Sequence, residues 1–187
     1  MLALQPDAVW AQATELPAWR VGATLGYVDG FGSKFRPWSG AVAFGGRLEL
    51  ELTRRLELMA GMEYARRCYP DPLVVQGLAL SGCESVSLLR AFAGPTLTIF
   101  SIGEVAAPFV GIRAGFIRQS YSVTEHGVEF GLTGGTAILL TSVVALDIAV
   151  GASAVYLGSG VFQERSFGSP GWGTLLFTSL SLTLEMP

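Results

Sequence analysis

Long apolar runs are absent from this sequence, although its composition is apolar overall. The mean hydropathy of +0.48 and the 50% hydrophobic content suit a membrane protein. Yet no stretch approaches the roughly 18 to 20 uninterrupted apolar residues that a spanning helix needs. The longest candidate, 137–151, contains Thr141, Ser142 and Asp147. Because lipid admits only helices and closed barrels, the chain is predicted to cross a membrane with strands.

Charged residues are also scarce, and their distribution excludes one class of partner. Charged residues make up 14% of the chain, the net charge is −3, and no basic run is longer than two residues. Nucleic acid is therefore excluded as an expected partner, since a phosphate backbone needs a basic face. The 187 residues suffice for one domain. The 24 glycines would weaken helices but are tolerated in curved strands.

Alternation with period two is the dominant pattern from Trp19 onward, and it restarts eight times. Period two places one side chain on each face of a strand in turn, here one apolar face and one mixed face. The runs are 19–27, 42–52, 56–64, 85–95, 109–119, 128–140, 145–156 and 172–185. The facing of 85–95 stays unassigned, because Arg90 shares a face with Val86, Leu88 and Phe92. The fold class expected is all-β: an eight-stranded antiparallel up-and-down transmembrane β-barrel with its polar face inside.

The connections alternate in length. Those after the second, fourth and sixth runs are short, and long loops are expected at 29–39, 66–84, 121–127 and 158–171. Short periplasmic turns and long external loops are typical of bacterial outer-membrane barrels. Aromatic residues gather on the apolar face at the loop-bearing ends, where they predict an interfacial girdle: Tyr27, Tyr64, Phe130, Tyr156 and Trp172. A soluble barrel with an apolar ligand is the alternative, because its core also alternates.

The expected interior face carries charges of both signs. An eight-stranded lumen is just wide enough for side chains, so unpaired charges there are costly, and a salt-bridged plug is predicted rather than an ion path. Arg47 in particular should pair with a neighbouring carboxylate. The network comprises Arg20, Arg47, Glu49, Glu51, Glu57, Glu63, Arg113 and Asp147.

Two cysteines and one histidine limit the chemistry further. Cys68 and Cys83 stand at the two ends of the expected 66–84 loop and predict a disulfide in an exported protein. No metal site or cofactor is expected, since one histidine is too few for zinc and no loop gathers the oxygens that calcium requires.

The first residues predict an export-signal remnant or a disordered arm over 1–18, followed by the barrel domain, 19–187. Ala11-Gln12-Ala13 has the small-x-small form of a signal-peptidase site, but residues 1–10 lack a basic region and contain Asp7.

Three segments carry a resemblance to a known group: 19–27 (WRVGATLGY), 46–52 (GRLELEL) and 108–116 (PFVGIRAGF). The pattern over about 19–185 resembles the small outer-membrane β-barrel families of the OmpA transmembrane domain and OmpX. The resemblance implies fold and an outer-membrane location, and little about activity. One departure is the C-terminus, which ends Leu184-Glu185-Met186-Pro187 instead of in the aromatic residue usual for such barrels.

His126 is the residue that bears on catalysis. Outer-membrane lipid A deacylases are small barrels whose catalytic histidine precedes a serine by two positions, whereas this chain has His126-Gly127-Val128. The chain is therefore predicted not to be an enzyme and to have no catalytic residues. The expected function is a non-enzymatic outer-membrane barrel with a plugged polar interior, structural or acting on partners through four long loops. Its partners would be outer-membrane lipid and a surface or envelope protein. The alternatives are a lipid-modifying enzyme of the deacylase type and a small-solute channel.

Overall fold

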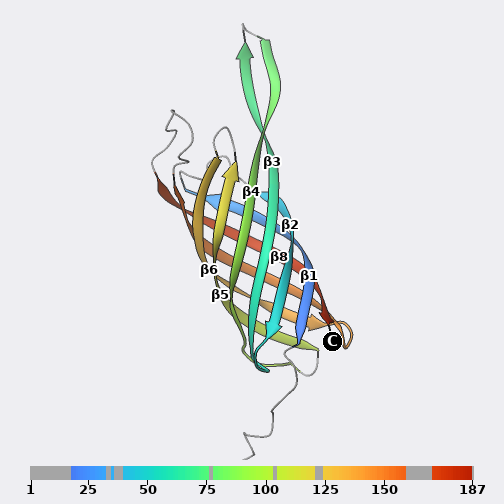
Figure 1. Cartoon of the computed structure of the whole chain (residues 1–187). Coiled ribbons are helices and arrows are strands. Elements are labelled where there is room, and N and C mark those ends of the chain that lie inside the picture. The colour runs from blue at the N-terminus through green and yellow to red at the C-terminus, as the bar shows by residue number, and fades with distance from the viewer. Residues whose placement is uncertain are drawn as a thin grey trace, which may run out of the picture.

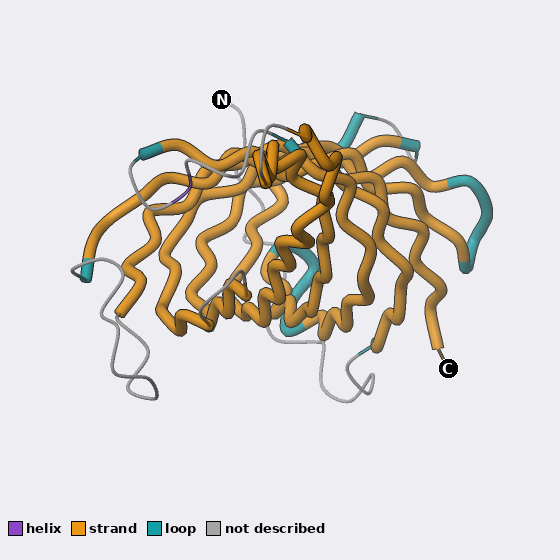
Figure 2. The backbone as a smooth tube through the Cα atoms, turned by 90° about the horizontal axis from the view of Figure 1, so that it is seen from above, coloured by secondary structure: helices purple, strands orange, loops and turns teal. Residues whose placement is uncertain are grey.

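The computed structural model describes residues 18–32, 35, 40–75, 78–102, 105–120, 124–158 and 170–186, and leaves aside the side chains of 69–84. These residues form eight strands in a closed barrel, each antiparallel to its sequence neighbours, with β8 pairing to β1 (Figures 1 and 2). The fold class and the all-antiparallel order predicted from the alternation are confirmed. The strands are β1 (Trp19–Phe31), β2 (Ala41–Glu51), β3 (Leu56–Val75), β4 (Leu78–Thr98), β5 (Ala106–Ser120), β6 (Thr124–Leu139), β7 (Val144–Gly158) and β8 (Gly171–Met186).

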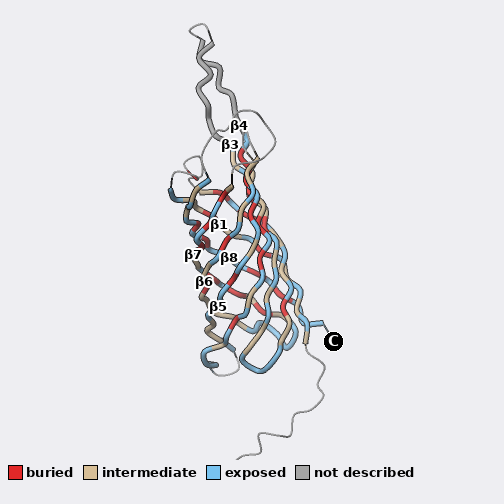
Figure 3. Tube along the Cα trace, turned by 60° about the vertical axis from the view of Figure 1, so that its left-hand side comes forward, coloured by how far each residue is buried: buried red, intermediate tan, exposed pale blue. Residues whose placement is uncertain are grey.

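The wall is apolar outside and mixed inside, the reverse of a soluble barrel. Buried and exposed residues alternate along each strand (Figure 3). On the outer face Leu132 and Trp172 are 66% and 63% exposed, while inward Arg90 and Glu129 are 1% and 0% exposed. Apolar side chains are stable in that exposed position only against lipid. Among the described residues, no helix is long and apolar enough to span a membrane.

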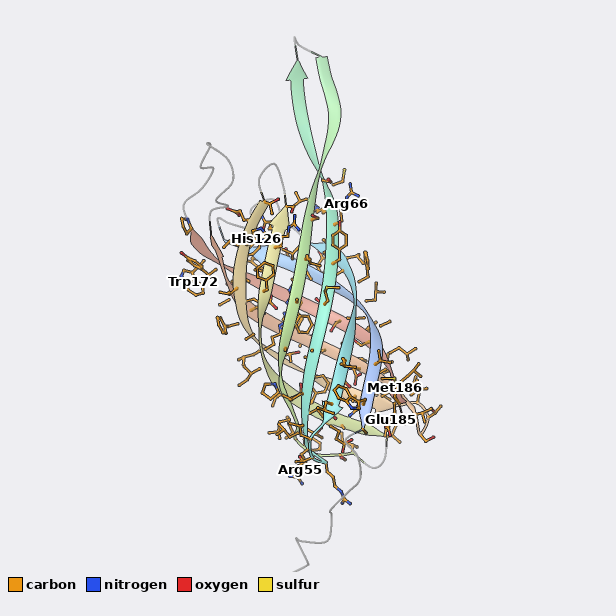
Figure 4. All side chains as sticks on the ribbon, in the orientation of Figure 1. Arg55, Arg66, His126, Trp172, Glu185 and Met186 are labelled. Carbon is orange, nitrogen blue, oxygen red and sulfur yellow. The ribbon has the colours of Figure 1, made fainter. Side chains whose placement is uncertain are left out.

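The two ends of the barrel differ. One end, called here the turn end, carries the short connections 52–55 and 140–143, together with Glu185 and Met186 near the C-terminus (Figure 4). The other, called the hairpin end, carries β3 and β4 where they extend past the rest of the wall (Figure 1).

The prediction of a long loop over 66–84 is wrong, because this segment forms the extension of β3 and β4. Their pairing continues from Arg66↔Ser87 to Val75↔Leu78. Two apolar runs flank Gln76-Gly77, and such a spacing favours a hairpin. The segment contains Pro70 and Pro72. Among the described residues β2 pairs with β3 only as far as Ala65, so a proline beyond that point removes no described hydrogen bond to β2.

The loop expected over 121–127 is also shorter than predicted. β6 begins at Thr124, and its pairing with β5 starts at Ser120↔Thr124. His126 therefore lies in a strand, directly opposite Arg118. The segments 1–17 and 159–169, with most of the loop after β1, lie outside the described residues, so the export signal is not addressed by the structure.

Candidate functional site

The lumen of the barrel holds two groups of ion-paired side chains. The first group lies at the turn end. Arg47 of β2 pairs with Glu49 (2.8 Å) and, across the lumen, with Asp147 of β7. Arg20 of β1 pairs with Glu57 of β3 and lies 3.5 Å from Glu49. This turn-end cluster, Arg20, Arg47, Glu49, Glu57 and Asp147, holds two arginines and three carboxylates. Because its members come from β1, β2, β3 and β7, it joins opposite walls of the barrel.

A second group, the central cluster, lies further toward the hairpin end. Arg90 of β4 donates to Glu63 of β3 (3.0 Å) and, through two nitrogens, to both oxygens of Glu129 of β6 (3.0 and 3.2 Å). Arg113 of β5 donates to the hydroxyl of Ser153 (3.0 and 3.2 Å) and lies 3.7 Å from Glu129. Two arginines face two carboxylates, so the cluster of Glu63, Arg90, Arg113 and Glu129 is neutral as a unit.

Two phenylalanine rings fill the space around the arginines of the central cluster. The guanidinium carbon of Arg113 lies 3.4 Å from the ring centroid of Phe177 and 4.9 Å from that of Phe92. Each ring lies over a cross-strand glycine: a Cβ on Gly151 would stand 2.1 Å from Phe177 Cζ. On Gly61 it would stand 2.7 Å from Phe92 Cζ. These glycines allow the rings to lie flat against the wall and contact the cations.

Above the central cluster most of the buried inward side chains are apolar, with Gln119 among them. Inward side chains near the hairpin end of the strands, together with Phe35, are 0% or 1% exposed, and we call them the apolar cap: Val28, Phe35, Val86, Leu88, Ile117, Val155, Leu157 and Leu175. The alternation alone predicted a polar interior. The described interior is instead partly apolar. Between the two charged clusters the side chains leave a cavity of about 20 Å³, room for about one water.

At the turn end the lumen widens. A cavity of about 430 Å³ borders Arg20, Glu51 and Glu57, which are less buried than the central cluster. Arg47 Nε, Glu49 Oε2 and Thr96 Oγ1 are buried beside it without a hydrogen-bond partner among the described residues. Polar atoms on a cavity of this size are within reach of water.

The eight charges expected inside the barrel separate into these two levels. The structure brings Arg20, Arg47, Glu49, Glu57 and Asp147 together at the turn end. Glu63 and Arg113 belong to the central cluster, and Glu51 lines the cavity. Sequence reasoning missed Arg90 and Glu129. The phase of 128–140 already placed Glu129 opposite the apolar face, whereas Val86 and Leu88 obscured the facing of Arg90 because they belong to the apolar cap.

The five aromatic residues expected in a girdle all lie on the outer wall. Tyr27, Phe130, Tyr156 and Trp172 are exposed and Tyr64 is half-exposed. Tyr156 and Trp172 are in contact, with ring centroids 5.2 Å apart, and Figure 4 shows Trp172 toward the hairpin end. Amphipathic rings at this position suit the boundary between lipid and water.

The cysteines lie on the projecting hairpin. Cys68 is paired in register with Ser85 and Pro70 with Cys83, so the two cysteine backbones are two residues out of direct opposition. Cys68 is disulfide-bonded in the structure. The side chain of Cys83 lies outside the described part, and a Cys68–Cys83 bridge in exported protein stays a prediction.

His126 is exposed on the outer face of β6. Its ring lies 5.6 Å from that of Phe116. Among the described residues, the hydroxyls of Ser120 and Thr124 lie within hydrogen-bond distance of each other (3.3 Å). Within the described part of the chain, no group of three or more His, Cys, Asp or Glu side chains is placed to hold a metal ion. Within the described residues, no hydrogen bond joins His126 to a hydroxyl or carboxylate side chain, as a catalytic triad would require.

Comparison with known proteins agrees with this architecture. No protein-family model matches the sequence, and a search of curated proteins gives no match. Among solved structures, the crystal structure of Neisserial surface protein A is similar, at 15% identity over 90% of this chain and 97% of that one, with a TM-score of 0.61. The outer membrane protein OprG of Pseudomonas aeruginosa is 8% identical, over 91% and 96% respectively, with a TM-score of 0.56. The chain therefore has the fold of the small eight-stranded outer-membrane β-barrels.

Proposed function

We propose that the protein is a non-conducting, non-enzymatic barrel of the outer membrane that acts through its external surface. The observation that carries this proposal is the filled lumen: the cavity between the two charged clusters has a volume of about 20 Å³, too little for a hydrated ion or a solute. A channel needs a continuous water path, and here ion pairs and an apolar cap occupy successive levels.

The orientation follows from the two ends. Outer-membrane barrels have short periplasmic turns and longer external segments. The projecting β3–β4 hairpin would then stand outside the cell, and the 430 Å³ cavity would open toward the periplasm. In this orientation the outward-facing parts are the hairpin and the loops around it, which are the elements available to a surface or envelope partner.

The test is conductance in planar bilayers, with protein whose fold has been verified by its shift in gel mobility on boiling. Wild-type protein should give no steady current. A variant with Leu88→Ala, Leu157→Ala and Leu175→Ala removes three members of the apolar cap and should leak more than wild type, because it opens space above the central cluster.

The matched control removes three leucines of the outer wall, Leu176→Ala, Leu180→Ala and Leu182→Ala, each about half-exposed. This control should stay silent, since its lost volume faces lipid. Steady wild-type channels, or leakage from both triple variants that is equal and clearly above wild type, would show that the lumen is not sealed as proposed and would favour a transport function.

A further inference from the structure

Three cationic or donor side chains stand on the outer wall at the hairpin end: Arg66 of β3, Arg118 of β5 and His126 of β6. All three are exposed, and Arg118 and His126 are directly opposite each other. Figure 4 shows Arg66 and His126 at this end of the barrel. We call them the rim patch.

The rim patch is compact and rich in hydrogen-bond donors. Arg66 is opposite Ser87, and Ser87 is opposite Ser120, which is two residues from Arg118. With strands about 4.8 Å apart and about 3.4 Å per residue, the Cα atoms of the two arginines are roughly 12 Å apart, so both guanidinium groups can reach one anionic group. Among the described outward residues of this stretch there is no carboxylate, and Glu125 falls in the inward phase of β6.

These arginines differ from those inside the barrel. Arg20, Arg47, Arg90 and Arg113 each lie within 4 Å of a carboxylate. Within the described part of the chain, Arg66 and Arg118 form no ion pair. A cation on a lipid-facing wall is costly unless it reaches the interface and an anion. The missing carboxylate therefore points to an anion from outside the chain.

The apolar residues below the rim patch identify what kind of anion this is. Two residues nearer the turn end, on the same outward faces, are Tyr64, Phe116 and Val128. A ligand that meets the arginines from the membrane side must carry hydrocarbon against this surface and its charge at the level of the aromatic girdle. A soluble anion would make no use of that apolar surface.

We propose that Arg66, Arg118 and His126 bind the phosphate groups of a phosphorylated glycolipid of the outer leaflet, whose acyl chains lie along Tyr64, Phe116 and Val128. Guanidinium groups recognise phosphate through paired, charge-assisted hydrogen bonds, and Ser87 and Ser120 add neutral donors. The site occupies one side of the barrel: on the opposite side, the outward phase of β1 carries Asp29. The proposal goes beyond the sealed lumen but uses the same orientation, with the hairpin end outside.

The experiment measures lipid A binding to the full chain in phosphatidylcholine nanodiscs, by native mass spectrometry of the released barrel. The double variant Arg66→Gln/Arg118→Gln should bind bis-phosphorylated lipid A about 30-fold more weakly than wild type, from roughly fivefold per surface arginine. The matched control, Arg54→Gln/Arg55→Gln, removes the same charge from the exposed turn at the other end. It should change the affinity by less than about twofold.

Three results would overturn the proposal. Lipid A stripped of both phosphates could bind wild type as tightly as the intact lipid, or the two double variants could lose equal affinity. Alternatively, in discs without lipid A, water-soluble polyphosphate could bind the patch as tightly as lipid A does, which would make the ligand a soluble anion. Gel mobility before and after boiling verifies that each variant is folded. None of these results bears on conductance, so the sealed-lumen proposal is tested separately.

Discussion

Arg90→Met is the most informative single perturbation of the lumen. Arg90 is 1% exposed and donates three hydrogen bonds to two carboxylates, of which Glu129 is 0% exposed. Methionine keeps much of the side-chain length and can pack against the rings of Phe92 and Phe177. The variant therefore removes charge and hydrogen bonds more than volume.

The expected cost follows from what the substitution leaves behind. Glu129 keeps only the longer 3.7 Å contact with Arg113, and Glu63 loses its 3.0 Å partner. Removing one member of a buried ion pair destabilises a protein by about 3 to 5 kcal/mol, which corresponds to a change of two to three orders of magnitude or more in the folding equilibrium. The double variant Arg90→Met/Glu129→Gln leaves one arginine and one carboxylate and should recover part of this loss.

The assay is the urea dependence of folding into detergent micelles, read from the gel mobility of unboiled samples. Arg55→Met, on the exposed turn 52–55, is the control and should stay within about 0.5 kcal/mol of wild type. If Arg90→Met costs less than about 1 kcal/mol, the value of an exposed pair, then the central cluster is hydrated and the reasoning fails. A double variant less stable than the single one would also contradict it.

Two further predictions follow from the same structure. Arg47→Ala should destabilise the barrel more than Arg55→Ala but less than Arg90→Met, because its cluster borders the cavity and Arg20 and Glu57 keep side-chain exposures of 17% and 20%; the same urea titration measures this, and equal stability of the Arg47 and Arg55 variants would contradict it. Cys68 and Cys83 should be linked in protein exported to the periplasm, since that compartment favours disulfides; mass spectrometry without reductant should find the linked peptides, and two free thiols in folded, exported protein would argue against the bridge.

Strand order and facing were largely predictable from sequence, because period two survives wherever one face meets lipid. In β2, Phe44 and Leu48 face outward while Arg47 and Glu49 face inward, as the pattern predicted. The facing of β4 was ambiguous for a physical reason. Its inward residues change along the strand from apolar, Val86 and Leu88, to charged, Arg90, because they pass from the apolar cap to the central cluster.

Most pairing partners of the charged residues inside the lumen could not be predicted from the sequence. Arg47 was expected among carboxylates of its own and the adjacent strand, including Glu57 and Glu63. Arg47 does pair with Glu49 of its own strand, as expected. Glu57, however, pairs with Arg20 and Glu63 with Arg90, while Arg47 also reaches Asp147 on the far wall. Alternation fixes which way a side chain points. The stagger and tilt of a closed barrel decide which side chains meet across it.

The bond between Arg47 and Asp147 also has a consequence for biogenesis. The two residues are 100 positions apart, on β2 and β7. An open sheet would hold them on strands that are far apart, so Arg47 acquires this counter-ion only when the sheet curls and its first and last strands approach. Until that moment the inner face of β2 carries a charge that hydrocarbon would reject. Closure and entry into the bilayer are therefore expected to occur together, because the pairing of β1 with β8 is what brings Asp147 of β7 to Arg47.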